Sequence, residues 1–380
     1  MKKPNLFLFI TLGFLLKVFS LLKGNRITKQ LKIKGPAIVL SNHTSFYDFV
    51  YTTSALYPRR VSYLAAQKMF YESGTRFFLK LARAIPKSLM QADPVATLRA
   101  FRILKKKGIV SVFPEGQISP SGTMNPLSFS IAKFLKKASV DVYTVKHKNA
   151  YLVNPPWTKK TFKGRIETEK ELIIKKENLD FLSLEDIYQI VTEKLYFSTS
   201  SYNKEKKYTY RFSDIKGLEN VIYQCPSCLH EGLESHKDRL LCPACQHEIV
   251  YDQYGMLNEK ELDLYFYEQA KRVENEINYN HNYELSSKVI LQSIDKDMLK
   301  TVGFGRLTLN KETYTYEGSY KNELKKLTFQ VKNIQSLPSD IGRNIQIYEG
   351  YQIYQFEMST PWLPTKFVHA GEYLYKHHKK

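Results

Sequence analysis

The chain has 380 residues, enough for two or three domains, and 43% of them are apolar, which supports real hydrophobic cores. Its four cysteines lie in one cluster, which excludes a disulfide framework spread along the chain. The net charge of +20 and the pI near 9.5 imply an anionic partner, which could be a membrane surface, a nucleic acid or a phosphorylated substrate.

The N-terminal segment is apolar. Residues 6–22 are almost wholly hydrophobic and follow a small positive cap at residues 1–3. A secretory signal peptide has this charge and length, but no small-x-small cleavage site follows. The run is short for a full membrane span, and Lys17 can reach the interface. We expect residues 1–24 to form an uncleaved helix in one leaflet of the cell membrane, at its cytoplasmic face. The alternative is a buried amphipathic helix of the next domain.

Residues 25–200 alternate between strand-like and helix-like segments. Short apolar runs predict strands at 27–33, 37–40, 60–65, 109–113 and 140–145. Helical periodicity and end signals predict helices at 48–56, 72–84, 94–107, 128–137 and 184–195. This alternation predicts an α/β domain with a mostly parallel sheet and flanking helices. Sites in such sheets lie at the carboxyl ends of the strands.

Polar residues follow two of these strands. Asn42 and His43 come after strand 37–40, and Asp48 lies five residues beyond His43. If the turn folds back, the Asp48 carboxylate holds one imidazole nitrogen, which fixes the tautomer and makes His43 a stronger general base. The segment Phe113-Pro114-Glu115-Gly116 ends the strand at 109–113. Simpler explanations are a capping or core histidine, a carboxylate in the first turn of a helix, and a turn that ends a strand.

These two motifs, His43-x4-Asp48 after Asn42 and then Phe113-Pro114-Glu115-Gly116, resemble the glycerolipid acyltransferases of the lysophosphatidic acid (1-acylglycerol-3-phosphate) type over residues 30–165. The resemblance implies an O-acyltransferase that uses acyl-CoA or acyl-carrier protein as thioester donor, with His43 as general base. It implies an acceptor, a lysophospholipid or glycerol-phosphate-like molecule, that binds at Pro114, Glu115 and Gly116. Glu115 would contact acceptor hydroxyls, and Gly116 would let the backbone approach closely. Membrane lipids are then partners.

The chain departs from the family pattern at the phosphate contacts. Gln117 and Ile118 stand where the family has Thr and Arg, and Lys87 stands at best for a second Arg, without the bidentate fork. The segment 143–145 also lacks the proline of the family's fourth motif. Acyl transfer is therefore better supported than the identity of the acceptor. The alternative function is a catalytically silent acyltransferase fold that binds lipid or acts as a scaffold.

After a polar linker at 201–220, two Cys-x2-Cys pairs lie in residues 221–255: Cys225, Cys228, Cys242 and Cys245. Four thiolates at this spacing predict a zinc ribbon with structural Zn²⁺, because a full shell leaves no open position for catalysis. The alternatives are two disulfides or redox pairs. The nearby His230, His236 and His247 are expected at the surface. Acidic residues offset the positive charge of this module, so we expect that it does not bind nucleic acid.

The remaining chain changes character. Apolar residues at helical spacing predict a helical connector at 256–284. From 285 to 380, alternating segments followed by a helix at 365–376 predict a β-rich domain, which weakly resembles pleckstrin-homology or GRAM domains. That resemblance implies contact with lipids or with a protein partner through the C-terminal half.

Overall fold

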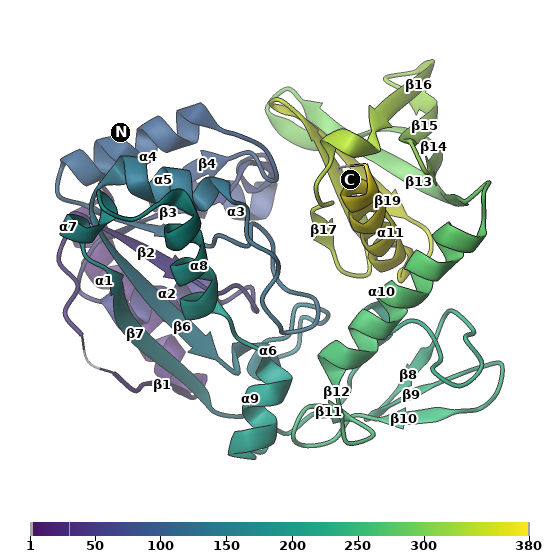
Figure 1. Ribbon diagram of the computed structural model, residues 1–380, viewed down its shortest axis with the longest axis horizontal. Helices are drawn as coiled ribbons and strands as arrows, with labels where there is room; N and C mark the ends of the chain where they lie inside the picture. The colour runs from purple at the N-terminus through teal and green to yellow at the C-terminus, as the bar shows by residue number, and fades with distance from the viewer. Residues whose placement is uncertain (1–2, 30, 379–380) are drawn as a thin grey trace. The chain divides into compact units, whose positions relative to one another are not determined.

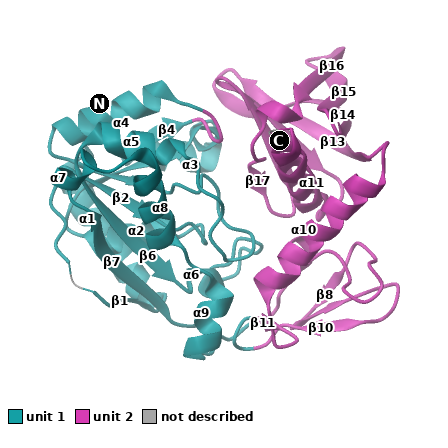
Figure 2. Cartoon of the chain, viewed as in Figure 1, with its two compact units in different colours: residues 1–87, 92–212, 253–255 teal, residues 88–91, 213–252, 256–380 magenta. Residues whose placement is uncertain are grey.

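The computed structural model describes residues 3–29 and 31–378, so the first two residues of the predicted cap and the last two residues of the chain lie outside it. The chain divides into two compact units (Figure 2). The first unit contains residues 1–87, 92–212 and 253–255, and the second contains 88–91, 213–252 and 256–380. The domain boundaries predicted from the sequence stay predictions.

The first unit is built on a mixed sheet with the strand order β1-β7-β6-β2-β5-β3-β4 (Figure 1). Its strands are β1 (Asn25–Ile27), β2 (Ala37–Ser41), β3 (Val61–Ala66), β4 (Ile85–Lys87), β5 (Ile109–Val112), β6 (Asp141–Lys148) and β7 (Ile166–Ile174). β6 and β7 pair antiparallel, whereas the other neighbours pair parallel. The predicted mostly parallel sheet is therefore confirmed. β1 is shorter and earlier than predicted, because it pairs with β7 only along Asn25–Ile27.

Helices cover both faces of this sheet. The helices of the first unit are α1 (Leu6–Leu22), α2 (Asp48–Leu56), α3 (Ser73–Leu81), α4 (Pro94–Lys105), α5 (Ser130–Ala138), α6 (Ala150–Val153), α7 (Lys176–Leu179), α8 (Leu184–Leu195) and α9 (Thr199–Lys206). A short 3₁₀ helix, η1 (Gln67–Phe70), follows β3. Alternate residues of β2 point to opposite faces: Ile38 and Leu40 pack with α4, α5 and α8, whereas Val39 packs with α2. Burial on both sides explains why β2 is a continuous apolar run.

The predicted apolar helix forms as α1 and packs its Gly13 and Phe14 against Tyr57, after α2. The predicted localisation at the cell membrane through this helix is wrong. Across residues 3–29 and 31–378, no helix is both long and apolar enough to cross a membrane. The 17 residues of α1 span roughly 26 Å, less than the ~30 Å of a bilayer's hydrocarbon core.

The second unit contains a short sheet followed by a larger antiparallel one. The short sheet has the order β10-β9-β8, from β8 (Glu234–His236), β9 (Arg239–Leu241) and β10 (Glu248–Val250). Before it lies η2 (Leu218–Asn220), and after it come β11 (Met256–Leu257), β12 (Lys260–Glu261) and α10 (Leu262–Tyr279). The helix predicted in 256–284 is thus confirmed as α10, whose Val273 and Ile277 join the core of the larger sheet.

The larger sheet has the order β16-β15-β14-β13-β19-β18-β17. Its elements are β13 (Glu284–Asp295), β14 (Met298–Asn310), β15 (Thr313–Tyr320), β16 (Glu323–Gln330), η3 (Val331–Asn333), β17 (Ser339–Asp340), β18 (Asn344–Glu349), β19 (Gln352–Met358) and α11 (Leu363–His377). The predicted β-rich C-terminal region with a final helix is confirmed. α11 packs Phe367, Ala370 and Leu374 into the core of this sheet.

Candidate functional site

The turn between β2 and α2 brings His43 and Asp48 together. His43 Nδ1 lies 3.0 Å from Asp48 Oδ2, and the same oxygen accepts the backbone N–H groups of Thr44 at 2.7 Å and Ser45 at 2.8 Å. Because a carboxylate only accepts hydrogen bonds, Nδ1 carries a proton, so in the neutral ring it is Nε2 that holds the lone pair. Asp48 is fully buried, whereas one fifth of the His43 side chain is exposed. The pair can therefore act as an oriented base at the protein surface.

The second motif lies directly against this turn. The ring of Phe113 stacks on the His43 ring, with centroids 4.4 Å apart. Glu115 Oε1 accepts the backbone N–H of His43 at 2.6 Å, and Oε2 accepts that of Asn125 at 2.8 Å. Gly116 has φ +75°, a left-handed conformation that favours glycine after the strand. Pro114 lies between these contacts and is half-buried. The motifs that the sequence separates by about seventy residues thus form one site.

Glu115 is 3% exposed. Burial raises its pKa to about 8, while the N–H groups of Asn125 and His43 act in the opposite direction because they stabilise the charged form. Burial thus favours the neutral acid, whereas the contacts favour the ionised form, because each of the two oxygens accepts a peptide N–H. On these contacts we describe Glu115 as a buried carboxylate that two peptide groups hold.

Lys87 does not meet this site. It ends β4, and β5 and β3 lie between β4 and the β2 strand that carries His43. Three strand spacings place it roughly 14 Å from the end of β2. Lys87 is half-buried, and burial lowers its pKa while Asp93 acts in the opposite direction. The structure places Lys87 on the same edge of the sheet as His43, but as a separate group.

The sequence did not single out His147, which lies behind the His43 turn. Asn42 Oδ1 accepts the His147 backbone N–H at 2.7 Å, and Asn42 Nδ2 donates to the His147 carbonyl at 3.1 Å. The His147 ring is buried between the hydroxyls of Thr52 at 2.8 Å and Thr168 at 3.0 Å. Burial lowers its pKa to about 4. The available signal was a histidine two residues beyond the predicted strand at 140–145.

The four predicted metal ligands lie together in the second unit. The Sγ atoms of Cys225, Cys228, Cys242 and Cys245 all lie within 4.8 Å of one another, so this cluster could bind a metal ion. Cys225 Sγ is 3.7 Å from Cys245 Sγ, and Cys228 Sγ is 3.6 Å from Cys242 Sγ. These separations exceed the S–S bond of about 2.05 Å and approach the ~3.8 Å edge of a tetrahedron with Zn–S bonds of about 2.3 Å.

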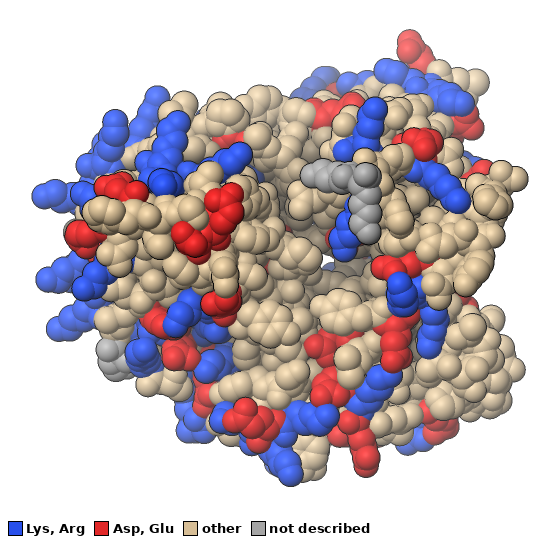
Figure 3. Space-filling model, in the orientation of Figure 1, with Lys and Arg blue, Asp and Glu red and all other residues tan. Residues whose placement is uncertain are grey.

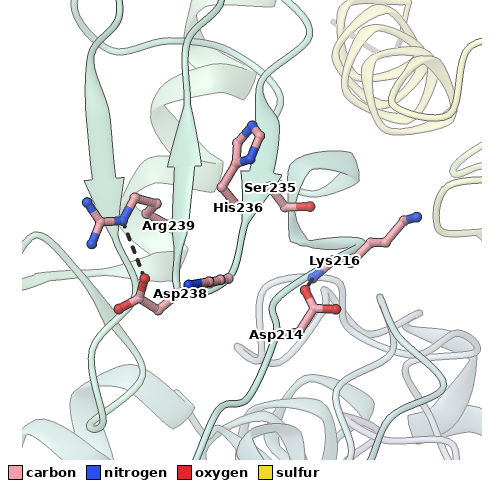
Figure 4. Close-up of a pocket in the computed structure, with 7 residues that line it drawn as sticks. Asp214, Lys216, Ser235, His236, Asp238 and Arg239 are labelled. Atoms are coloured by element: carbon pink, nitrogen blue, oxygen red, sulfur yellow. Dashed lines mark hydrogen bonds and ion pairs between the residues drawn. The ribbon is translucent and has the colours of Figure 1, made fainter.

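The second unit also has an open depression of about 610 Å³ (Figure 4). It is lined by Asp214, Lys216, Ser235, His236, Lys237, Asp238 and Arg239. Arg239 Nε donates to Asp238 Oδ1 at 3.4 Å, and the Lys216 backbone N–H donates to Asp214 Oδ1 at 2.9 Å. Two of the charged residues that line the depression, Arg239 and Asp238, are thus paired with each other. More widely, Figure 3 shows Lys and Arg spread over one face of the molecule with Asp and Glu among them.

Residues 24–148, which include His43, Asp48 and Glu115, match the acyltransferase family model. This match supports an acyltransferase, and the cysteine cluster lies outside the matched range. A crystal structure of the 1-acyl-sn-glycerophosphate (LPA) acyltransferase PlsC from Thermotoga maritima is similar to the chain at 19% identity, with a TM-score of 0.43. The similarity covers 53% of this chain and 79% of that chain. Among curated proteins, no sequence matches significantly.

Proposed function

We propose that the chain is an O-acyltransferase that moves an acyl group from a thioester donor to the hydroxyl of a lysophospholipid or a glycerol-phosphate-like acceptor. The observation that carries this proposal is the 3.0 Å contact between His43 and Asp48. It leaves the lone pair of Nε2 available, within a range that matches the acyltransferase family model. The donor in this proposal is acyl-CoA or acyl-carrier protein.

In the proposed reaction, His43 Nε2 takes the proton of the acceptor hydroxyl as its oxygen attacks the thioester carbonyl. A hydroxyl is a poor nucleophile near neutral pH, so it needs such a base. The C–O bond forms, the tetrahedral intermediate collapses, and the C–S bond breaks. The leaving thiolate then takes the proton from His43. Asp48 keeps the ring in place and stabilises the transient imidazolium, as in a triad whose serine is replaced by the acceptor.

For the acceptor, the proposal places the reacting end near the turn at Pro114 and Gly116. The left-handed backbone of Gly116 and its missing Cβ support close approach of a substrate there. Lys87 is proposed to meet a more distant anionic group, because it lies on the same sheet edge roughly 14 Å away. As a single charge without a fork, it would tolerate phosphodiesters and monoesters alike.

The test is release of free thiol from acyl-CoA, or of unacylated carrier protein, in the presence of lysophospholipids and glycerol 3-phosphate. Replacing the base, His43→Ala, should lower turnover by about 10²–10⁴-fold. The matched control is His281→Ala, because His281 is exposed and belongs to the second unit. If wild type and His43→Ala release thiol equally with every acceptor, the chain is a silent acyltransferase fold, and the proposal fails.

For the second unit, we propose that the four cysteines hold a structural Zn²⁺ as a zinc ribbon. Their Sγ separations support this, as does the antiparallel sheet β8–β10 beside them. Four thiolates complete a tetrahedral shell, so the ion would stabilise the fold and would not bind substrate. We also propose that residues 285–380 form a pleckstrin-homology-like domain, because β13 pairs with both β14 and β19 and a helix closes the chain.

A further inference from the structure

Three residues of the loop 113–119, which begins with the second motif, contact three different groups of His43. The Phe113 ring stacks on the imidazole at 4.4 Å. The Glu115 carboxylate accepts the His43 backbone N–H at 2.6 Å, and the Ser119 backbone N–H donates to the His43 carbonyl at 2.7 Å. Both peptide groups of His43 and one face of its ring are thus held by one loop.

This loop is itself fixed by hydrogen bonds. Ser119 Oγ donates to the Thr123 carbonyl at 2.6 Å and accepts the Gly122 N–H at 3.0 Å. Asn125 Nδ2 donates to the Gln117 carbonyl at 3.3 Å, and the Asn125 N–H donates to Glu115 Oε2 at 2.8 Å. Because the loop closes on itself, it can hold His43 without help from a substrate.

Glu115 is poorly placed to bind a ligand from solution. Its side chain is 3% exposed, and each of its two oxygens already accepts one backbone N–H. A buried carboxylate is costly unless hydrogen bonds stabilise its charge, and here the peptide groups of His43 and Asn125 do so. The carboxylate therefore joins the His43 turn to the loop that carries Glu115 and Asn125.

We infer that Glu115 is a positioning residue that fixes the backbone of His43, and not a ligand of the acceptor hydroxyls. This inference rests on the proposed function of His43 as the base. A base must stay within hydrogen-bond reach of the proton that it removes, and a displacement of about 1 Å can cost on the order of 10² in rate. Glu115 would hold this geometry through the main chain of His43, whereas Asp48 holds its ring.

The substitution Glu115→Gln separates this role from acceptor binding. An amide presents NH₂ to one of the two N–H donors, so one peptide group loses its acceptor. We expect kcat to fall about 10–10²-fold, with the acceptor KM unchanged within about twofold. A ligand of the acceptor would instead show a raised KM at nearly constant kcat, and this result would overturn the inference. If the proposed function itself is wrong, His43→Ala keeps the turnover of the wild type. This outcome is distinct from any effect of Glu115→Gln on kcat or KM.

A readout without turnover uses the His43 amide proton. The chain has nine histidines, so ¹⁵N-histidine labelling gives few backbone signals, and His43→Ala assigns the one at position 43. A short bond to a carboxylate moves this proton downfield in the wild type. In Glu115→Gln the His43 amide proton should move upfield whichever way the amide points, because a neutral amide oxygen is a weaker acceptor than a carboxylate. The His281 signal should stay in place. An unchanged His43 signal contradicts the inference. If Glu115→Gln does not fold, kcat, the acceptor KM and the His43 amide signal are measured in Glu115→Asp instead. Its side chain is one methylene shorter, and the same outcomes support or contradict the inference.

Discussion

At the scale of single residues, hydrogen bonds show which ring nitrogen of the buried His147 carries the proton in the neutral ring. Thr168 donates its hydroxyl proton to Asn25 Oδ1 at 2.7 Å, so it must accept from His147 Nδ1. His147 Nε2 then accepts from Thr52, whose oxygen can in turn accept from Ser41 at 3.2 Å. In the neutral ring both nitrogens are therefore paired, and it is burial that disfavours the charged form.

We predict that His147 makes the folded state sensitive to acid. Its pKa is lowered from 6.5 to about 4 by burial, so between these values the unfolded chain binds a proton that the folded chain does not. The free energy of unfolding should therefore fall as pH decreases from 6.5 to 4, by about 3 kcal/mol from this residue. Urea unfolding at pH 7, 5 and 4 measures this loss.

The variant His147→Gln isolates this contribution. Glutamine can donate and accept but does not titrate, so its loss of stability between pH 7 and pH 4 should be about 3 kcal/mol smaller than that of the wild type. His369, whose pKa burial lowers to about 3, titrates in both proteins and cancels in the comparison. Parallel pH curves for the two proteins would show that His147 is not the group responsible.

At the scale of elements, a side-chain cap explains where α8 begins, although the sequence predicted this helix from its amphipathic pattern. α8 begins after Ser183, whose Oγ accepts the Asp186 N–H at 3.0 Å, while Asp186 Oδ2 accepts the Ser183 N–H at 3.0 Å. This reciprocal cap satisfies N–H groups that lack partners in the first turn. The predicted range 184–195 is confirmed to the residue.

Removing this cap should weaken the first unit. We expect Ser183→Ala to lower the free energy of unfolding by about 0.5–2 kcal/mol, because the Asp186 N–H loses its acceptor. Urea unfolding measures the change. Ser183→Asp is the control, because aspartate is also a favoured capping residue. Equal losses in both variants would mean that the serine contributes through something other than the cap.

At the scale of the whole molecule, the cysteine cluster is tied to the rest of the second unit. Gln269 of α10 accepts the N–H groups of Tyr223 at 2.7 Å and Gln224 at 3.0 Å, next to Cys225. The Tyr223 ring stacks on Trp362, with centroids 5.1 Å apart. Lys366 Nζ bridges Glu231 at 2.7 Å and Glu276 at 2.9 Å. Loss of the cluster's geometry would therefore spread into α10 and α11.

We predict one Zn²⁺ per chain, and unfolding of the second unit at lower temperature when it is removed. Structural zinc supplies folding free energy directly, so a chelator or Cys242→Ser should lower the melting transition of this unit. The transition of the first unit should stay in place, because the cluster lies outside it. Metal analysis and calorimetry of the full chain measure both effects. Ser227→Ala is the control, an exposed position between two ligands. Iron, or no metal, would contradict the zinc proposal.

Much of this architecture follows from local pattern. Apolar runs set β2 and β5, and periodicity set α2, α4 and α10, because each depends on neighbours within a few residues. The contact between His43 and Asp48 was also predictable from the sequence, because a strand-to-helix turn can bring together side chains that are five residues apart. The membrane prediction rested on the apolar composition of residues 6–22, but these residues form α1, a helix of 17 residues that is too short to cross a membrane.

The sequence by itself indicated the apolar strands β2 and β5, most of the longer helices, the His43–Asp48 pair and the cysteine set, because their spacing is short and their chemistry is specific, but it did not indicate β7 or α9. Only the tertiary structure decided which distant groups meet. It placed Glu115 on the backbone of His43, Asn42 on His147, and Lys87 three strand spacings away. These relations depend on strand order and on the direction of side chains at strand ends, and no local pattern encodes either. The contact of Glu115 with the His43 backbone is the basis for the inference that Glu115 positions the base.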